Sequence, residues 1–201
     1  MQYLYNIIKP ETITGMTEDT LILYHYAMNF KFKNILELGV GPYGNSTRTF
    51  ALASSQIPDS KFISVDIDEN CIKEMSKKLQ ELGLDKYVTF IVDDSINVLR
   101  QSPSSFYDCI FMDTSHEYKQ TLTELFLAAS KINLHNDNAC IFLHDTMKME
   151  VWEPINIFLA YSPYWLHIEF NTEGGLGLLM KKSYFQLARM YDESKFYKEK
   201  T

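Results

Sequence analysis

The chain has 201 residues, which at roughly 150 residues per domain favours one domain over two. Its composition is 46% hydrophobic and 22% charged, which is too apolar for a disordered chain. The net charge of −7 and the lack of any Lys/Arg block disfavour nucleic acid as a partner, because phosphate backbones attract basic surfaces.

Short apolar runs alternate with amphipathic stretches along most of the chain. The apolar runs are rich in Ile, Phe and Val, and they predict strands at 34–39, 61–66, 88–92, 107–112 and 139–144. The amphipathic stretches predict helices at 17–29, 47–55, 68–83, 95–100, 116–132 and 150–160. Strand–helix alternation at this pitch predicts a mostly parallel sheet with helices on both faces.

The end of the chain departs from this alternation. Two further predicted strands, 164–170 and 177–181, are separated only by the segment NTEGGL. A parallel crossover needs a dozen or more residues, so these two strands are expected to form an antiparallel hairpin. The expected organisation is one domain over residues 1–201, with a core at about 30–182, an N-terminal helix at about 17–29 and a tail at 183–201.

The first predicted strand runs into a glycine-rich segment, ELGVGPYGNST, that begins at Glu37. In open α/β sheets, ligands bind beyond the carboxyl ends of the strands. Gly39, Gly41 and Gly44 fit the spacing G-x-G-x-x-G, which lets a ligand approach the backbone but also occurs in ordinary glycine turns. A dehydrogenase normally has an apolar residue at the position of Glu37. Burying a carboxylate there costs several kcal/mol unless it is hydrogen-bonded, and a nearby cationic ligand is one reason to keep it.

Acidic residues also follow the second and third predicted strands. Asp66 ends the second strand, where a carboxylate can accept both hydroxyls of a ribose. Asp68 is better explained as a helix cap. Of Asp93 and Asp94, one suits an adenine amino group, while the other caps the helix that begins at Ser95. Three acids at neighbouring strand ends fit a nucleoside.

The fourth and fifth predicted strands end in acids and histidines that a nucleoside does not need. Asp113-Thr-Ser-His116 follows the fourth strand, and His144-Asp145 ends the fifth. Carboxylates and imidazoles that converge on one point can hold a divalent cation, which polarises a hydroxyl. The alternative is that Asp113 and Asp145 cap the helices that follow them.

Together these segments resemble the class I S-adenosylmethionine-dependent methyltransferases. The segment ELGVG resembles the first motif of that family, Asp66 its ribose-binding acid, and Asp93-Asp94-Ser95 its adenine-site motif. YDCIFMDTSHEY at 107–118 and ACIFLHDT at 139–146 are similar to a branch of small-molecule O-methyltransferases and cephalosporin-hydroxylase-like proteins. The resemblance covers roughly residues 30–182.

The resemblance implies a Rossmann-like, doubly wound α/β sheet of seven strands in the order 3-2-1-4-5-7-6, with strand 7 antiparallel. It also implies S-adenosyl-L-methionine as the cofactor. The residues expected at the cofactor site are Glu37, Gly39, Gly41, Ser46, Asp66, Ile67, Asp94, Ser95 and Asp113. In metal-dependent relatives, the positions of Asp113, His144 and Asp145 bind magnesium. His144 is a departure from that pattern, since imidazole suits a transition metal better.

The resulting hypothesis is a methyltransferase that methylates a hydroxyl of a small metabolite or glycoside. Its candidate catalytic residues are His144, Asp113 and His116. A divalent ion (Mg²⁺ or Mn²⁺) held by Asp113 and Asp145 would lower the pKa of the hydroxyl. Without a metal, His144 or His116 would act as the general base. Two alternatives are a non-catalytic nucleoside-binding or cofactor-binding module and an NAD-dependent oxidoreductase, which has no use for the acids after strands four and five.

The three cysteines are too few and too scattered for a disulfide framework, and the sequence begins without a secretory signal pattern. No apolar run approaches the roughly 18 residues of a membrane span. We therefore expect a cytoplasmic protein that binds a small-molecule acceptor rather than a nucleic acid or a membrane. A homo-oligomer is compatible with the sequence.

Overall fold

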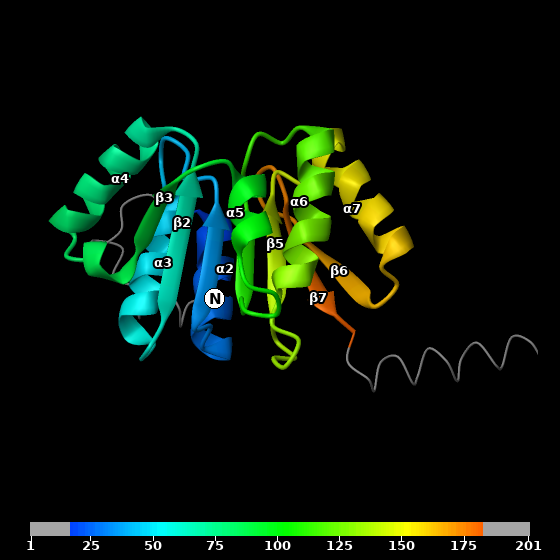
Figure 1. Ribbon diagram of the computed structural model, residues 1–201, viewed down its shortest axis with the longest axis horizontal. Coiled ribbons are helices and arrows are strands. Elements are labelled where there is room, and N and C mark those ends of the chain that lie inside the picture. Colours follow the sequence, from blue (N-terminus) through cyan, green and yellow to red (C-terminus); the bar gives the residue numbers. More distant parts are fainter. Residues whose placement is uncertain (1–16, 183–201) are drawn as a thin grey trace, which may run out of the picture.

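A computed structural model describes residues 17–182, so the predicted C-terminal tail lies outside the described residues. A seven-stranded sheet runs through the middle of this part of the chain, with helices on both faces (Figure 1). The strands are β1 Asn34–Leu38, β2 Lys61–Asp66, β3 Thr89–Val92, β4 Cys109–Met112, β5 Cys140–His144, β6 Trp165–Phe170 and β7 Leu176–Lys181.

The strand order is β3-β2-β1-β4-β5-β7-β6. The five strands from β3 to β5 pair in parallel, and β7 pairs antiparallel with both β5 and β6. The structure therefore confirms the predicted sheet, including the antiparallel hairpin at its end. The reason is the short connection after β6, which cannot cross over the sheet and must fold back on itself.

Six α-helices and a short 3₁₀ helix, η2 Asp85–Tyr87, cover the sheet within residues 17–182. The α-helices are α2 Glu18–Phe30, α3 Asn45–Gln56, α4 Glu69–Glu81, α5 Ser95–Gln101, α6 Tyr118–Lys131 and α7 Met149–Tyr161. None of these helices is both long enough and apolar enough to cross a bilayer.

Each face of the sheet carries its own hydrophobic core. Alternate residues of a strand point to opposite faces, so Ile35 packs with buried side chains of α2, α3 and α4, whereas Leu36 packs with those of α5, α6 and α7. Both residues are fully buried. Burial on both faces explains why the central strands read as continuous apolar runs.

Most helix boundaries agree with the prediction to within two residues, and the differences have local causes. Asp68 caps α4 as expected, because its side chain accepts the backbone N–H of Asn70. The helix predicted from His116 begins only at Tyr118. His116 itself has a φ of 57°, a left-handed conformation that a right-handed helix cannot include.

Candidate active site

A cavity of about 660 Å³ opens at the carboxyl edge of the sheet. Its size lies in the range of small-molecule sites, which is about 300–1,000 Å³. Five segments line it: the first turns of α2, the glycine loop after β1, the end of β4, the end of β5, and the loop between β6 and β7. The lining residues are Thr17–Thr20, Leu23, Val40–Ser46, Phe111, Asp113, His144, Asp145, Glu173 and Gly174.

The glycine loop is shaped by two glycines with different surroundings. Gly39 has a φ of 94°, and a Cβ atom there would lie 2.0 Å from the carbonyl oxygen of Asp113. Only glycine therefore lets the end of β1 approach the end of β4 this closely. At Gly41 (φ 60°) an added Cβ would meet no atom within 4 Å, so this part of the loop is open to a ligand.

Glu37 lies beneath this loop and is fully buried. Its Oε2 accepts hydrogen bonds from the hydroxyls of Thr47, at 2.7 Å, and Ser64, at 2.5 Å. Burial raises the pKa of Glu37 to about 7, although these hydroxyls favour the carboxylate and partly offset the rise. Glu37 thus joins β1, α3 and β2 behind the loop, and it does not line the cavity.

Asp66 holds the loop from the neighbouring strand. Its Oδ2 accepts the backbone N–H groups of Val40, at 2.8 Å, and Gly41, at 3.1 Å, and its Oδ1 accepts that of Asp68. Of roughly four acceptor positions on a carboxylate, one remains for a ligand in this arrangement. Ile67, the next residue, is 73% exposed and offers an apolar surface beside Asp66.

The expected adenine-site residues are partly engaged by the protein itself. Asp94 caps α5 by accepting two backbone N–H groups on Oδ1, which leaves its Oδ2 outside the cap. The hydroxyl of Ser95 donates to Glu124, which also accepts a hydrogen bond from Thr114. Glu124 therefore connects the start of α5 to the loop that follows β4. The roles of Asp94 and Ser95 toward a cofactor stay predictions.

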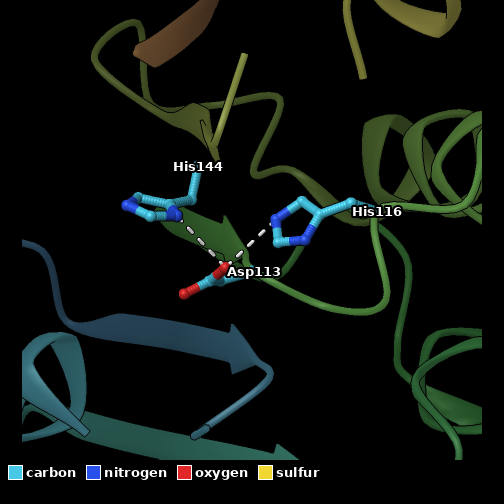
Figure 2. A group of neighbouring side chains, drawn as sticks. All are labelled: Asp113, His116 and His144. Carbon is cyan, nitrogen blue, oxygen red and sulfur yellow. Dashed lines mark ion pairs between the residues drawn. The ribbon is translucent and has the colours of Figure 1, made fainter. Parts of the chain in front are cut away.

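Asp113, His116 and His144 converge on one point beside the cavity. Figure 2 shows the two imidazoles approaching the Asp113 carboxylate from different sides. His116 Nε2 lies 3.2 Å and His144 Nδ1 lies 3.3 Å from the same oxygen, Asp113 Oδ1. Both nitrogens are buried, yet neither makes a hydrogen bond of acceptable geometry with a described residue. One donor atom from each side chain lies within 4.8 Å of the others, as in a metal site.

Two residues of this region adopt the left-handed conformation, which costs a non-glycine residue about 1–2 kcal/mol. His116 has a φ of 57° and Asp145 a φ of 56°. Such outliers gather at functional sites, where the surrounding structure keeps them in place. Asp145 pairs with Lys148, and the next residue, Thr146, donates a hydrogen bond from its buried hydroxyl to Glu169 of β6.

The electrostatics of the cluster favour positive charge within it. Burial by itself would raise the pKa of Asp113, but the imidazoles of His116 and His144 hold it well below its usual range. Burial would lower the pKa of His144, but Asp113 and Asp19 raise it to about 10. A histidine in this state carries a proton at neutral pH and cannot accept another, which argues against His144 as a general base.

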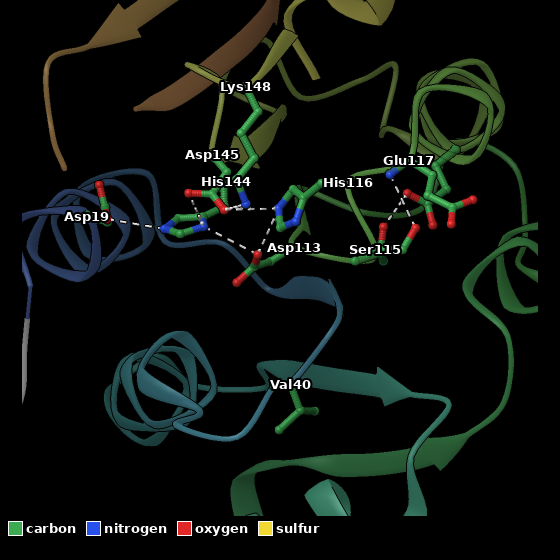
Figure 3. Close-up of polar contacts among 12 residues, drawn as sticks. Asp19, Val40, Asp113, Ser115, His116, Glu117, His144, Asp145 and Lys148 are labelled. Atoms are coloured by element: carbon green, nitrogen blue, oxygen red, sulfur yellow. Dashed lines mark hydrogen bonds and ion pairs between the residues drawn. The ribbon is translucent and has the colours of Figure 1, made fainter. Parts of the chain in front are cut away.

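Two residues that the sequence did not single out complete the cluster (Figure 3). Asp19 of α2 places its Oδ2 3.4 Å from His144 Nε2, and Lys148 pairs with Asp145 at 2.5 Å. Acidic residues are common in the first turn of a helix because they interact favourably with the helix dipole. Nothing in the sequence therefore distinguished Asp19 as a site residue. For Asp145 and Lys148, the separation of three positions in the sequence was the one feature that could have predicted an ion pair.

Comparison with known proteins places this geometry in a family. Residues 36–146 match a family model described as "Methyltransferase domain", and this segment includes the glycine loop, Asp66 and the cluster around Asp113. The chain belongs to this methyltransferase family. By family and by the strand order of its sheet it is a class I S-adenosylmethionine-dependent methyltransferase, so the oxidoreductase alternative is set aside.

Solved structures similar to this methyltransferase support the fold. A methyltransferase from Geobacter sulfurreducens is 18% identical, with a TM-score of 0.68 over 90% of this chain and 88% of that one. The O-methyltransferase TomG from Streptomyces achromogenes, in complex with SAM, is 15% identical, with a TM-score of 0.66 over 90% and 86%. An O-methyltransferase from Bacillus cereus in complex with SAH is 15% identical, with a TM-score of 0.67 over 90% and 88%.

Curated relatives match a shorter part of this methyltransferase. The polyamine aminopropyltransferase of Prochlorococcus marinus (strain MIT 9515) is 39% identical over 85 residues, which are 40% of this chain and 29% of the relative. That of strain MIT 9215 is 40% identical over 86 residues, which are 41% and 29%. This chain thus spans less than a third of the length of these relatives.

Proposed function

We propose that this methyltransferase moves a methyl group from S-adenosylmethionine to a hydroxyl of a small molecule bound in the cavity. The observation that carries the proposal is the shape of that cavity. It joins the glycine loop, a candidate cofactor surface, to Asp113 and His144, which form a candidate acid–base or metal-binding surface. A donor and an acceptor held in one such space gain the rate advantage of proximity and orientation.

The residues around the glycine loop fit the cofactor. Gly41 faces open space, Asp66 retains an acceptor position at the loop, and Ile67 exposes an apolar side chain next to it. We assign Asp66 to the ribose, Ile67 to one face of the adenine and Gly41 to the amino-acid portion. When bound, S-adenosylmethionine supplies an electrophilic methyl group on its sulfonium.

Activation of the acceptor falls to the residues after β4 and β5. We assign the role of general base to His116, whose Nε2 lies 3.2 Å from Asp113 Oδ1 beside the cavity. Asp113, His116 and His144 also fit a divalent metal, since two buried imidazole nitrogens face one carboxylate oxygen without hydrogen bonds. Such an ion would act as a Lewis acid that lowers the pKa of the hydroxyl.

The test is calorimetry with S-adenosylmethionine on the wild type and on Asp66→Ala. We expect binding by the wild type and a loss of roughly tenfold or more in affinity in the variant, since an ionised hydrogen-bond partner contributes about 1.5–3 kcal/mol. Val92→Ala, on a half-exposed side chain at the end of β3, is the control for a general effect at this edge of the sheet. Absence of binding by the wild type would refute the proposal.

Turnover separates an enzyme from a module that only binds the cofactor. Formation of S-adenosylhomocysteine is measured with a panel of hydroxylated small molecules. Production that depends on the acceptor and falls in Asp113→Ala supports transfer. Cofactor binding without any production across the panel supports the binding module instead.

A second candidate is transfer to an amine. Five carboxylate residues and no lysine or arginine are among the described residues that line the cavity, and such a wall favours a cationic acceptor. The names of the curated relatives, polyamine aminopropyltransferases, point the same way. Adding diamines and polyamines to the acceptor panel distinguishes the two candidates, because only one class should accelerate the reaction.

A further inference from the structure

His144 is held between two carboxylates, one on each ring nitrogen. Its Nδ1 faces Asp113 Oδ1, and its Nε2 faces Asp19 Oδ2 at 3.4 Å (Figure 3). Metal-binding histidines almost always offer one nitrogen to the ion and donate the other N–H to a carboxylate, a carbonyl or water. Asp19 occupies the position of that outer carboxylate.

Asp19 is buried in a way that its place on the helix does not explain. It lies in the first turn of α2 beside Glu18 and is only 7% exposed, whereas Glu18 is exposed. An acid that serves the helix dipole has no need of burial, and Glu18 already supplies that interaction. Burying a carboxylate is costly unless a charge or hydrogen bond compensates it. Within the described residues, Asp19 Oδ2 contacts the His144 ring at 3.4 Å, and this contact accounts for the buried position of the carboxylate.

Two of the three distances within the cluster match those between ligands of one ion, and the two nitrogens lie within 4.8 Å of each other. Atoms that bind a common metal at about 2.1 Å stand roughly 3 to 3.4 Å apart in octahedral or tetrahedral sites. The two imidazole nitrogens stand 3.2 Å and 3.3 Å from Asp113 Oδ1. Neither nitrogen makes a hydrogen bond of good geometry with a described residue, which is compatible with both of them binding an ion.

The donor set also indicates which metals fit. Two imidazoles and one carboxylate suit first-row transition metals, whereas magnesium prefers oxygen ligands. Asp145, the further oxygen ligand expected at this edge, is paired with Lys148 at 2.5 Å. Its oxygens lie 3.5 Å from His144 and 3.7 Å from His116. Asp145 thus borders the cluster but is already neutralised by a cation.

We propose that Asp113, His116 and His144 form a centre that is selective for a transition-metal dication, and that Asp19 of α2 is a positioning residue that holds His144 toward the ion. The metal centre deepens the proposed function. The chemical role of the ion rests on that function, whereas the binding of the ion does not. It also gives α2 a role in the chemistry, because a helix outside the strand-and-loop motifs supplies one of the four side chains.

The test is a titration with Co²⁺, whose visible absorption reports its ligands, followed by competition with Mg²⁺. We expect the wild type to bind Co²⁺ and to retain it against an excess of Mg²⁺ of about a hundredfold. Asp19→Asn should lower the affinity by about 10–100-fold, the usual effect of losing an outer partner of a ligand. Glu18→Gln is the matched control, since it removes the same charge one residue away and should change the affinity less than about threefold.

Further variants keep the proposal falsifiable if Asp19→Asn fails to fold, which circular dichroism will show. His116→Gln and His144→Gln should each weaken Co²⁺ binding and alter its absorption spectrum, because each removes an imidazole from the ion. Equal affinities for Co²⁺ and Mg²⁺, or unchanged binding in both histidine variants, would overturn the centre. Equal losses in folded Asp19→Asn and Glu18→Gln would overturn the role of Asp19.

Calorimetry with S-adenosylmethionine in the presence of EDTA separates this proposal from the proposed function. A wild type that binds S-adenosylmethionine but no Co²⁺ refutes the metal centre and leaves methyl transfer standing. A wild type that binds Co²⁺ but no S-adenosylmethionine supports the centre and refutes the proposed function.

Discussion

Replacing Glu37 by glutamine should change how the stability of the protein depends on pH. Glutamine has nearly the volume of a protonated glutamate, and the hydroxyls of Thr47 and Ser64 can rotate to suit an amide. Burial raises the pKa of Glu37 from 4.5 to about 7. Such a shift corresponds to about 3 kcal/mol at 1.36 kcal/mol per pKa unit, and complete burial means that little of it is screened by solvent.

The sign follows from proton binding. With rising pH the unfolded chain releases the Glu37 proton near 4.5, whereas the folded protein keeps it up to about 7. The wild type therefore loses stability between these two values and little more above them. About 2 kcal/mol of this loss falls between pH 5.5 and 8 by the same relation. Glu37→Gln has no proton to lose there, so its stability relative to the wild type should rise by that amount.

The assay is urea unfolding of the wild type and Glu37→Gln at several pH values from 5.5 to 8, above the sequence pI near 5.2. At each pH, the difference between the two free energies of unfolding cancels the contributions of the titratable groups that both proteins have. Glu69→Gln, on an exposed glutamate of α4, is the control and should give a difference of less than about 1 kcal/mol. A difference for Glu37→Gln that stays constant across this range would refute the reasoning.

Two further predictions concern the two ends of the sheet. Gly39→Ala should cost about 3 kcal/mol or more of unfolding free energy, because its Cβ would overlap the carbonyl of Asp113, whereas Gly41→Ala, in open space, should cost about 1–2 kcal/mol for its positive φ alone. Equal losses on urea unfolding would contradict this. Asp108→Ala should cost about 3 kcal/mol, since Asp108 is buried and accepts two backbone N–H groups and two asparagine amides. It lies at the amino end of β4, away from the cavity, so the folded variant should bind S-adenosylmethionine with unchanged affinity on calorimetry.

The elements of this protein could be predicted from the sequence because their signals are local. A run such as that of β5 is apolar at every position, and β5 is buried on both faces. The short segment between β6 and β7 likewise required an antiparallel return. Where the prediction failed by two residues, at the start of α6, the cause was the left-handed conformation of His116. That conformation is held by the surrounding structure and not by the intrinsic preference of histidine.

The candidate site residues at the strand ends could likewise be predicted from their positions in the sequence, but the side chains that they contact could not. The sequence indicated that Asp113, His144 and Asp145 would lie at one edge of the sheet. Their contacts depend on side-chain direction and on neighbours distant in sequence. Thus Asp145 is paired with Lys148, and both imidazoles face Asp113.

The sequence by itself determined the class of fold, the strand order that its resemblance implied, and the edge of the sheet at which the candidate site residues lie. Hydrophobic periodicity and the lengths of connections indicated the α/β class and the terminal hairpin, whereas the order of the strands came from the resemblance to a known family. Only the tertiary structure decided that Asp19 meets His144, across 125 positions of the chain (144 − 19). That contact depends on how α2 packs over the sheet, which no local pattern of residues encodes.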